Sequence, residues 1–281
     1  SVDRTVTAEA MPGGSEELKS DLGEIEASLR SAPRRYLAGS TTEEIDQALA
    51  LCRDHAENCS PEMYQTEQAR EIVLEPFALD SREASVDDFG AFVEATGYVT
   101  TAEKLGYSHV VEAGTSIRRP GLSWRQPLED GREAEPDLPV MHISYEDAKA
   151  FCAWSGKRLP SEEEWEHMAR GPERHSYAWG EEWREDSVPR TVQPVTSDES
   201  WLNGNLWEWV TIAGEDVGGL KGGSFAETNP ANLRLAARRE AGGEREDGGG
   251  GVEARWQVGI GLGERLAHGD QGHDREEAGP G

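Results

Sequence analysis

The segment that most constrains the fold is Pro139 to Gly171, which reads PVMHISYEDAKAFCAWSGKRLPSEEEWEHMARG. Ser144 and Ser161 each stand at the start of a helical pattern of apolar residues, and Ser161 with Glu164 matches a capping box. A Gly-Lys-Arg-Leu-Pro turn separates the two patterns. The sequence therefore predicts two short helices hinged on this turn, with their apolar faces in the core.

Short elements of the same kind occur earlier in the chain. Residues 41–55 have helical spacing with acids in the first turn, and residues 71–80 alternate as a strand does. Ser85 can cap a helix that Gly97 can terminate. Residues 98–138 are rich in Gly, Pro and charge, and they are predicted to form one long irregular loop, functional or disordered.

The formal net charge of −27 limits the partners of the chain. Nucleic acid and anionic membrane surfaces would repel it, so we expect neither nucleic-acid binding nor membrane insertion. Solubility is the plain explanation of the charge; a basic partner or bound divalent cations are the others. No apolar run is long enough for a transmembrane helix, and the polar first residues, SVDRTVTAEAMPGG, do not match a signal peptide, so a soluble protein is expected.

Three cysteines are too few for a disulfide framework. Cys52 and Cys59 could bridge a short loop in an oxidising compartment, whereas Cys152 lies inside a helical pattern and is expected to be packed. There is no Cys-x-x-Cys pair and no Cys/His zinc spacing. Whether the first two cysteines form a disulfide, and in which compartment the chain works, stays open at this level.

Composition divides the chain into three parts. Residues 1–30 are polar and acidic and are predicted to be a flexible arm, and residues 31–240 are predicted to form the folded domain. Residues 241–281 are rich in Gly, Glu and Arg. Apart from 256–267, they cannot bury enough apolar surface to offset their ordering entropy, so we expect most of this segment to be disordered.

Three further blocks accompany the hinged helices: YAWG at 177–180, NGNLWEWV at 203–210 and LKGGSFAETNPANLRLAARR at 220–239. In this order and spacing they resemble the formylglycine-generating enzyme family, whose members carry a sulfatase-modifying factor domain. The resemblance covers about residues 36–239. It implies an irregular α+β fold of the C-type-lectin-like kind, with short helices, small twisted antiparallel sheets and much ordered loop. Nine tryptophans agree with such a core, because large aromatic side chains can anchor many loops.

What the resemblance implies for catalysis breaks down at two positions. Active members of the family oxidise a substrate cysteine to formylglycine with a copper ion held by two cysteines, in the pattern GGS[FW]xCxxxxCxR. The corresponding residues here are Glu227 and Asn232, while Ser224 and Arg234 match the pattern. Cuprous copper prefers soft thiolates, and a carboxylate and an amide are hard donors. We therefore expect no catalytic residues of this kind and no copper cofactor.

A second enzymatic branch of the family consists of iron-dependent sulfoxide synthases of thiol-histidine biosynthesis. Its members carry an HxxxHxE element on a preceding helical domain. Before residue 80 this chain has one histidine, His55, so it does not match that branch.

Members of the wider family bind calcium through a GN[AV]WE loop. The resemblance places the ligands here at the backbone of Gly204 and Leu206 and at the Glu208 carboxylate, which are oxygen donors that suit calcium. The usual upstream side-chain oxygen falls at Trp201, which cannot coordinate, so the site would be weakened or empty. The alternative is that Glu208 accepts hydrogen bonds from backbone amides.

The resemblance also outlines a groove with candidate binding residues Trp207, Ser224, Glu227, Asn229, Asn232 and Arg234. Core packing is the rival explanation for Trp207, and a turn-stabilising hydroxyl is the rival explanation for Ser224. His142 and His167 stand beside apolar residues in segments predicted to be helical, and both are interpreted as structural.

The end of the chain departs from the family. Members commonly close with a Gly-Phe-Arg strand, which GLGERLA at 261–267 resembles with Glu264 in place of the buried Phe. An unpaired carboxylate in a core would be costly, so this closing strand is expected to be degenerate or displaced. A shifted reading frame after about Arg239 would also account for the change in composition.

The leading hypothesis is a family member that does not make formylglycine and acts as a binding module for a protein or peptide ligand. It rests on two observations: the motifs of the family's scaffold are intact, and neither thiol position holds a cysteine. Two alternatives stay open: copper-dependent oxidation of sulfatase cysteines through a remodelled site, and a structural accessory or degenerate member of the family. The sequence identifies neither the partner nor the oligomeric state.

Overall fold

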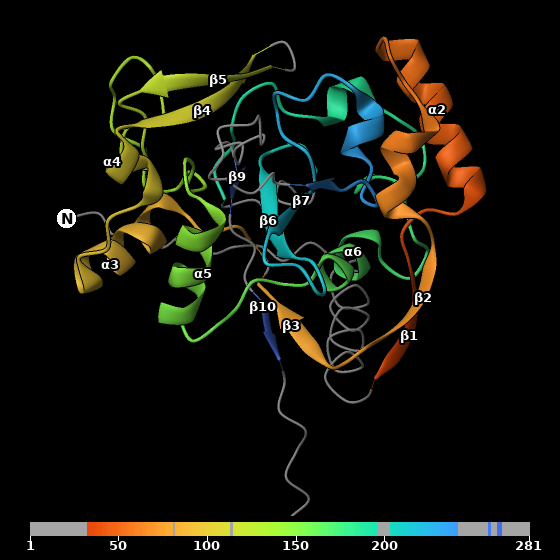
Figure 1. Cartoon of the computed structure of the whole chain (residues 1–281), viewed down its shortest axis with the longest axis horizontal. Coiled ribbons are helices and arrows are strands. Elements are labelled where there is room, and N and C mark those ends of the chain that lie inside the picture. The colour runs from red at the N-terminus through yellow and green to blue at the C-terminus, as the bar shows by residue number, and fades with distance from the viewer. Residues whose placement is uncertain are drawn as a thin grey trace, which may run out of the picture.

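The computed structural model describes residues 33–80, 82–112, 115–195, 203–240, 258–259 and 263–265. Within these ranges it is a mixed structure of short helices and small sheets joined by long loops (Figure 1). The helices are α2 (Thr42–His55), η1 (Pro61–Glu67), α3 (Val86–Thr96), α4 (Thr101–Leu105), α5 (Tyr145–Trp154), α6 (Glu162–Arg170), η2 (Glu185–Ser187) and η3 (Pro230–Leu233). The strands are β1 (Arg34–Ala38), β2 (Arg70–Leu74), β3 (Phe77–Leu79), β4 (Tyr107–Glu112), β5 (Thr115–Pro120), β6 (Trp207–Thr211), β7 (Gly218–Lys221), β8 (Arg239–Glu240), β9 (Val258–Gly259) and β10 (Gly263–Arg265).

Strand β6 is an inner strand of the largest described sheet, whose order is β8-β7-β6-β9. It pairs antiparallel with β7 and parallel with β9. The other described sheets are antiparallel pairs, β1-β2, β10-β3 and β4-β5. Because successive strand residues point to opposite faces, Trp207 and Trp209 lie on one face of β6, and Glu208 and Val210 lie on the other.

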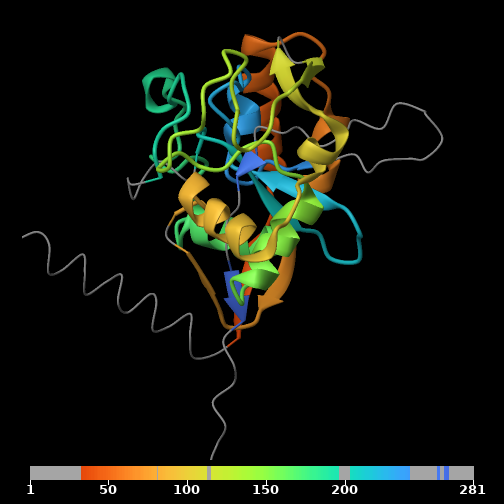
Figure 2. The same ribbon diagram turned by 90° about the vertical axis from the view of Figure 1, so that its left-hand side faces the viewer.

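The two faces of β6 pack against different helices. Trp207 and Trp209 join residues of α3 and α5 in the main hydrophobic core. On the opposite face, Val210 packs with Trp165 and Ala169 of α6. The views of Figures 1 and 2 place α3 and α5 side by side, while α2 lies at the other end of the molecule and packs on η3.

Every described α-helix begins with a capping box. The N-cap hydroxyl accepts a hydrogen bond from the N3 amide, and the N3 carboxylate accepts one from the N-cap amide. The N-caps are Thr41, Ser85, Thr100, Ser144 and Ser161. This confirms the predicted helices in 41–55, 85–97, 144–156 and 161–171. Helix α3 ends at Gly97, whose φ of 67° lies in the left-handed region that glycine tolerates.

The prediction of one continuous strand over 71–80 is wrong. β2 ends at Leu74 and β3 begins at Phe77, so the pattern is split between two sheets. Pro76 interrupts it, because proline has no amide hydrogen to donate to a ladder.

The prediction of one irregular loop over 98–138 is also wrong. This region contains α4 and the β4-β5 hairpin. The hairpin was hidden in the sequence because Ser108 and His109 are polar residues that are buried, which removes the alternation of a half-exposed strand.

His142 lies outside any helix, contrary to the prediction, at a bend just before α5 with a φ of 59°. Its ring is buried, with Nδ1 2.8 Å from the Ser108 hydroxyl and Nε2 3.0 Å from the Pro127 carbonyl oxygen. Burial lowers its pKa to about 4, so the ring is neutral at neutral pH. These contacts agree with a structural role for His142.

Cys52 and Cys59 form a disulfide that links the last turns of α2 to the loop before η1. Cys152 is buried in α5, as expected. Burial raises the pKa of its thiol to about 12, which keeps it protonated and unreactive.

The predicted arm, residues 1–30, and most of 241–281 lie outside the described residues, so these predictions stay predictions. Within 256–267 two short strands are described. β9 runs beside β6, and β10 pairs with β3. None of the described helices is both long enough and apolar enough to span a bilayer.

Candidate functional site

Trp207, the predicted groove tryptophan, is almost fully buried in the main core. The guanidinium of Arg239 lies 5.1 Å from the centre of its ring. That same guanidinium stands 3.5 Å from the Glu227 carboxylate. Burial lowers the pKa of Arg239, and the Glu227 charge partly offsets this effect. Arg239 therefore contacts both Trp207 and Glu227, the residue at the first thiol position of the family pattern.

The two positions at which the family pattern has thiols help to shape a turn. Glu227 Oε1 accepts hydrogen bonds from the amides of Thr228 (3.1 Å) and Asn229 (3.0 Å). Asn232 lies in η3, and its amide donates to the Asn229 carbonyl at 3.0 Å. Oxygen and nitrogen groups engaged in this way do not provide a soft two-thiolate site.

Asn229 and Arg234 connect this turn to the α2 side of the molecule. Asn229 Nδ2 donates to Cys52 Sγ at 3.1 Å. Arg234 donates to Glu67 Oε1 at 2.6 Å and to Ser40 Oγ at 3.2 Å. Both side chains are buried, so each holds separate segments together.

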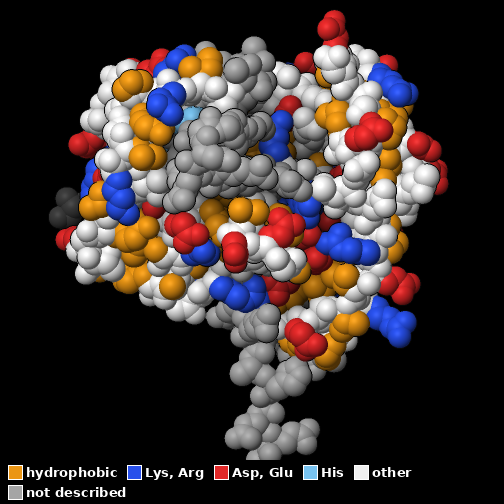
Figure 3. Space-filling model, in the orientation of Figure 1, with side chains coloured by type: hydrophobic (Ala, Val, Ile, Leu, Met, Phe, Trp, Pro, Cys, Tyr) orange, Lys and Arg blue, Asp and Glu red, His pale blue; other side chains and the backbone are white. Residues whose placement is uncertain are grey.

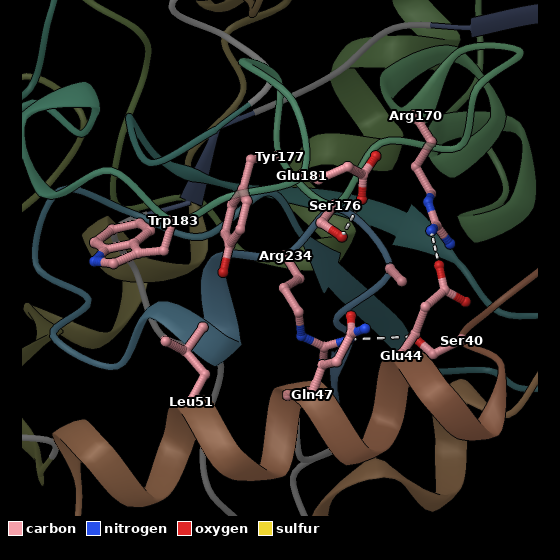
Figure 4. Close-up of a pocket in the computed structure, with 12 residues that line it drawn as sticks. Ser40, Glu44, Gln47, Leu51, Arg170, Ser176, Tyr177, Glu181, Trp183 and Arg234 are labelled. Atoms are coloured by element: carbon pink, nitrogen blue, oxygen red, sulfur yellow. Dashed lines mark hydrogen bonds and ion pairs between the residues drawn. The ribbon is translucent and has the colours of Figure 1, made fainter.

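A cavity of about 110 Å³ lies between α2 and the loop of residues 176–183 (Figure 4). α2 supplies Glu44, Gln47 and Leu51 along one wall, and Tyr177 and Trp183 come from the facing loop.

The polar groups around this cavity are largely paired. Arg170 donates to Glu44, the Ser176 hydroxyl donates to Glu181 at 3.0 Å, and Arg234 is also at the wall. At the cavity edge, Gln47 and Glu181 are exposed to solvent.

The structure distributes the six predicted groove residues over two places. Glu227 meets Trp207 through Arg239, whereas only Arg234 lines the cavity of Figure 4. Ser224 is buried, and its carbonyl accepts the Glu227 amide at 3.0 Å. A single groove formed by all six therefore stays a prediction.

Sequence reasoning missed the α2 wall of this cavity. Glu44 and Gln47 were assigned only to a helix, and no motif marks them. The one available signal was the YAWG block at 177–180, which borders the cavity through Tyr177.

The acidic charge is not concentrated on the face seen in Figure 1. Lys and Arg side chains are interspersed with Asp and Glu across it, and no broad basic area is visible (Figure 3).

The NGN loop before β6 is built by contacts with distant segments. Asn203 Oδ1 accepts the Ala178 amide at 2.6 Å, and its Nδ2 donates to the Leu233 carbonyl at 2.5 Å. Gly204 has a φ of 80°, and a Cβ there would lie 2.6 Å from Val188 Cγ1. Gly223, with a φ of 79°, is in a similar position against the Leu233 side chain. Both positions require glycine for packing as well as for backbone geometry.

Glu208, on β6, is fully buried, and neither of its carboxylate oxygens has a hydrogen-bond partner among the described residues. The predicted alternative, that it bonds backbone amides, is therefore not what these residues show. Burial raises the pKa of Glu208, and the carboxylate of Glu83 raises it further. The Trp165 indole partly offsets the shift without completing a hydrogen bond among the described residues.

Glu83 precedes α3 and was not identified from the sequence as a site residue. It is 1% exposed, and burial raises its pKa. Asn205 Nδ2 donates to its Oε2 at 2.9 Å, while Oε1 has no partner in the described ranges. No sequence signal links Glu83 to Glu208, because 124 positions separate them on the chain.

The residues around Glu208 fit a hard divalent cation. Two buried carboxylates leave three oxygens without hydrogen-bond partners in the described part of the chain. Carboxylate and carbonyl oxygens are the donors that calcium prefers. Gly204 and Leu206, whose carbonyls the resemblance adds, lie in the same loop, whereas Trp201 lies outside the described residues.

Comparison with known proteins decides the family. A family model described as the sulfatase-modifying factor enzyme 1-like domain matches residues 41–252. The chain belongs to this family. The irregular α+β arrangement of the sulfatase-modifying factor domain is thus confirmed, while the C-type-lectin-like detail stays an expectation.

The relatives of this sulfatase-modifying factor domain include enzymes and a protein named inactive. Inactive C-alpha-formylglycine-generating enzyme 2 of Mus musculus is 32% identical over 216 residues, which covers 60% of this chain and 70% of the relative. Formylglycine-generating enzyme of Thermomonospora curvata is 41% identical over 132 residues, which covers 40% of this chain and 44% of the relative. PvdO from Pseudomonas aeruginosa has a TM-score of 0.54 at 16% identity, covering 84% of this chain and 92% of that one, and shows a shared fold.

Proposed function

We propose that this chain is a sulfatase-modifying-factor-like domain that binds a protein or peptide ligand and does not synthesise formylglycine. The observation that carries the proposal is the chemistry at the two thiol positions. Glu227 closes a turn and pairs with Arg239, and Asn232 lies in η3. Cuprous copper finds no thiolate there.

The cysteines of the described residues do not replace the missing pair. Cys52 and Cys59 are bonded to each other, and Cys152 is buried with a raised pKa. The similarity to a mouse protein named as inactive supports the same reading, because it places a non-catalytic protein on this scaffold.

The ligand surface we favour is the edge of the cavity beside α2. Trp183 is half-buried there, and Gln47 and Glu181 are exposed. A cavity edge that carries an indole, an amide and a carboxylate suits a peptide, because the ring can take an apolar side chain while the polar groups pair with the peptide backbone. The net charge of −27 favours a basic peptide over an acidic one.

Catalysis is tested with copper, oxygen and a cysteine peptide of the sulfatase type. The purified chain is incubated with them in air under reducing conditions, and formylglycine is sought by mass spectrometry. We expect no product while an active family enzyme run in parallel gives product. Product that disappears in Glu227→Ala and Asn232→Ala variants would overturn the proposal.

Binding is tested by selection from a displayed library of basic peptides. We expect selected peptides to lose affinity by roughly tenfold or more in Trp183→Ala, as hot-spot aromatics do. The matched control is Trp154→Ala, which removes an exposed tryptophan of α5 and should leave affinity unchanged. Failure to select any peptide, or equal losses in both variants, would contradict the placement of the ligand surface.

A further inference from the structure

A surface groove of about 550 Å³ lies between β2, the end of α5 and the start of α6. Ile72, Val73 and Leu74 of β2 line it, together with the buried Leu159 from the turn between the two helices. Val73 is 61% exposed, a larger fraction than any other large apolar side chain of the described residues. An apolar side chain left open beside a groove with apolar walls is a place where a partner can be buried.

The chain enters the described structure next to this groove. β1 and β2 lie side by side (Figure 1), and β1 begins at Arg34, which is paired with Leu74 at the groove wall. Neighbouring strands lie about 5 Å apart, and four extended residues span roughly 13 Å. A segment that ends near residue 29 can therefore reach the groove from Arg34.

The sequence before β1 carries apolar residues in a regular pattern. They recur at intervals of four, three and four positions: Leu18, Leu22, Ile25 and Leu29. This is the spacing of one face of a helix, and charged or small residues occupy the positions between. A helix of this length with Gly23 inside it is marginal in water by itself. The pattern therefore indicates a segment that needs an apolar surface to pack against.

The charges at the groove suit this segment better than those of the average surface. Residues 16–30 hold five acids and two bases. Three bases and three acids line the groove, whereas the whole chain has 55 acids and 28 bases. One of the bases, Lys149, is exposed. An acidic segment is therefore repelled less here than over most of the molecule.

We propose that residues 16–30 of this chain bind in the groove beside β2, with their apolar side chains against Val73 and Leu74. The short connection to β1 favours this segment over a separate partner, because such a link gives an effective concentration on the order of millimolar. For these residues the proposal replaces the flexible arm that composition predicts. It does not depend on the proposed ligand-binding function, since this groove and the cavity beside α2 share no lining residue.

Amide hydrogen exchange of the full chain, followed by mass spectrometry, tests the proposal. We expect the amides of residues 18–30 to exchange roughly tenfold or more slowly than those of a free peptide of the same sequence. This protection should not change on dilution, because the contact is made within one chain. Ile25→Asp should abolish it. Ser20→Asp adds the same charge on the opposite side of the helical pattern and should preserve it.

The groove is tested from its own side by Val73→Asp, which should also abolish the protection. The matched control is Val99→Asp, which changes a valine that is 48% exposed between α3 and α4 and should preserve it. Unchanged exchange of the α6 amides verifies that each variant is folded. Exchange of residues 18–30 at the rate of the free peptide in the wild-type chain would overturn the inference. Protection that survives Val73→Asp, or that falls on dilution, would also overturn it, because the segment would then bind elsewhere or to a second copy.

Discussion

Glu67 on the α2 side and Glu166 on α6 are buried carboxylates that have bases, whereas Glu83 and Glu208 are buried without one among the described residues. Glu67 lies 2.6 Å from the Arg234 guanidinium, and Glu166 is met by Lys221 at 3.3 Å. Glu83 and Glu208 have no such partner among the described residues. A buried charge with a base holds two segments together, whereas a buried charge without one calls for a proton or an ion. The difference separates the groups that stabilise the fold from those available to a ligand.

The largest effect on stability is expected where a buried carboxylate loses its base. Arg234→Met removes the base of Glu67 and leaves that carboxylate buried and unpaired. We expect a loss of about 3–5 kcal/mol in the free energy of unfolding, measured by urea denaturation with tryptophan fluorescence. The control is Arg190→Met, whose exposed pair with Glu185 should contribute nothing measurable. Similar small effects in both variants would show that the α2 side does not depend on this pair.

The buried His142 tests whether hydrogen bonds alone can offset the cost of burying a side chain that can carry a charge. Both ring nitrogens of His142 are engaged, yet burial lowers its pKa from 6.5 to about 4. The folded state therefore binds fewer protons than the unfolded state below pH 6.5, so stability is full above that pH and falls toward pH 4.

The gap between the two pKa values corresponds to about 3 kcal/mol. Urea denaturation from pH 7.5 to pH 4 measures this loss. His142→Asn tolerates the left-handed backbone and should flatten the pH dependence. An unchanged slope in that variant would assign the acid sensitivity to other groups.

The smallest expected effect has the opposite sign and concerns β6. Without calcium, Glu208→Met replaces an unpartnered carboxylate with an apolar side chain of similar length, next to the core of Val210 and Trp165. We expect the free energy of unfolding to rise by about 1–2 kcal/mol. Destabilisation comparable to that of Arg234→Met would mean that Glu208 has a partner that holds the fold.

The local elements were predictable because their signals are local. Ser85, Ser144 and Ser161 each lie three residues before an acid, and each caps a helix. The β4-β5 hairpin was missed because the buried Ser108 is satisfied by His142, a contact that alternation along one strand cannot reveal.

The candidate sites depend on contacts between distant segments. The positions of Glu227 and Asn232 could be read from a motif, but the Arg239 that meets Glu227 could not. Likewise Glu208 lies in a recognisable block, whereas Glu83 reaches it only through the folding of the chain. The disulfide of Cys52 and Cys59 could not be decided from the sequence because such a bridge depends on an oxidising compartment, which the sequence does not identify.

The glycines at 204 and 223 have a practical consequence for surveys of genomes. A side chain at either position would collide with Val188 or Leu233, so these motif glycines serve packing whether or not a reaction takes place nearby. A search that retrieves proteins by their NGN and GGS blocks therefore identifies proteins with this fold, whether or not they are enzymes. The residues at 227 and 232 have to be inspected separately before any retrieved protein is credited with oxidase activity.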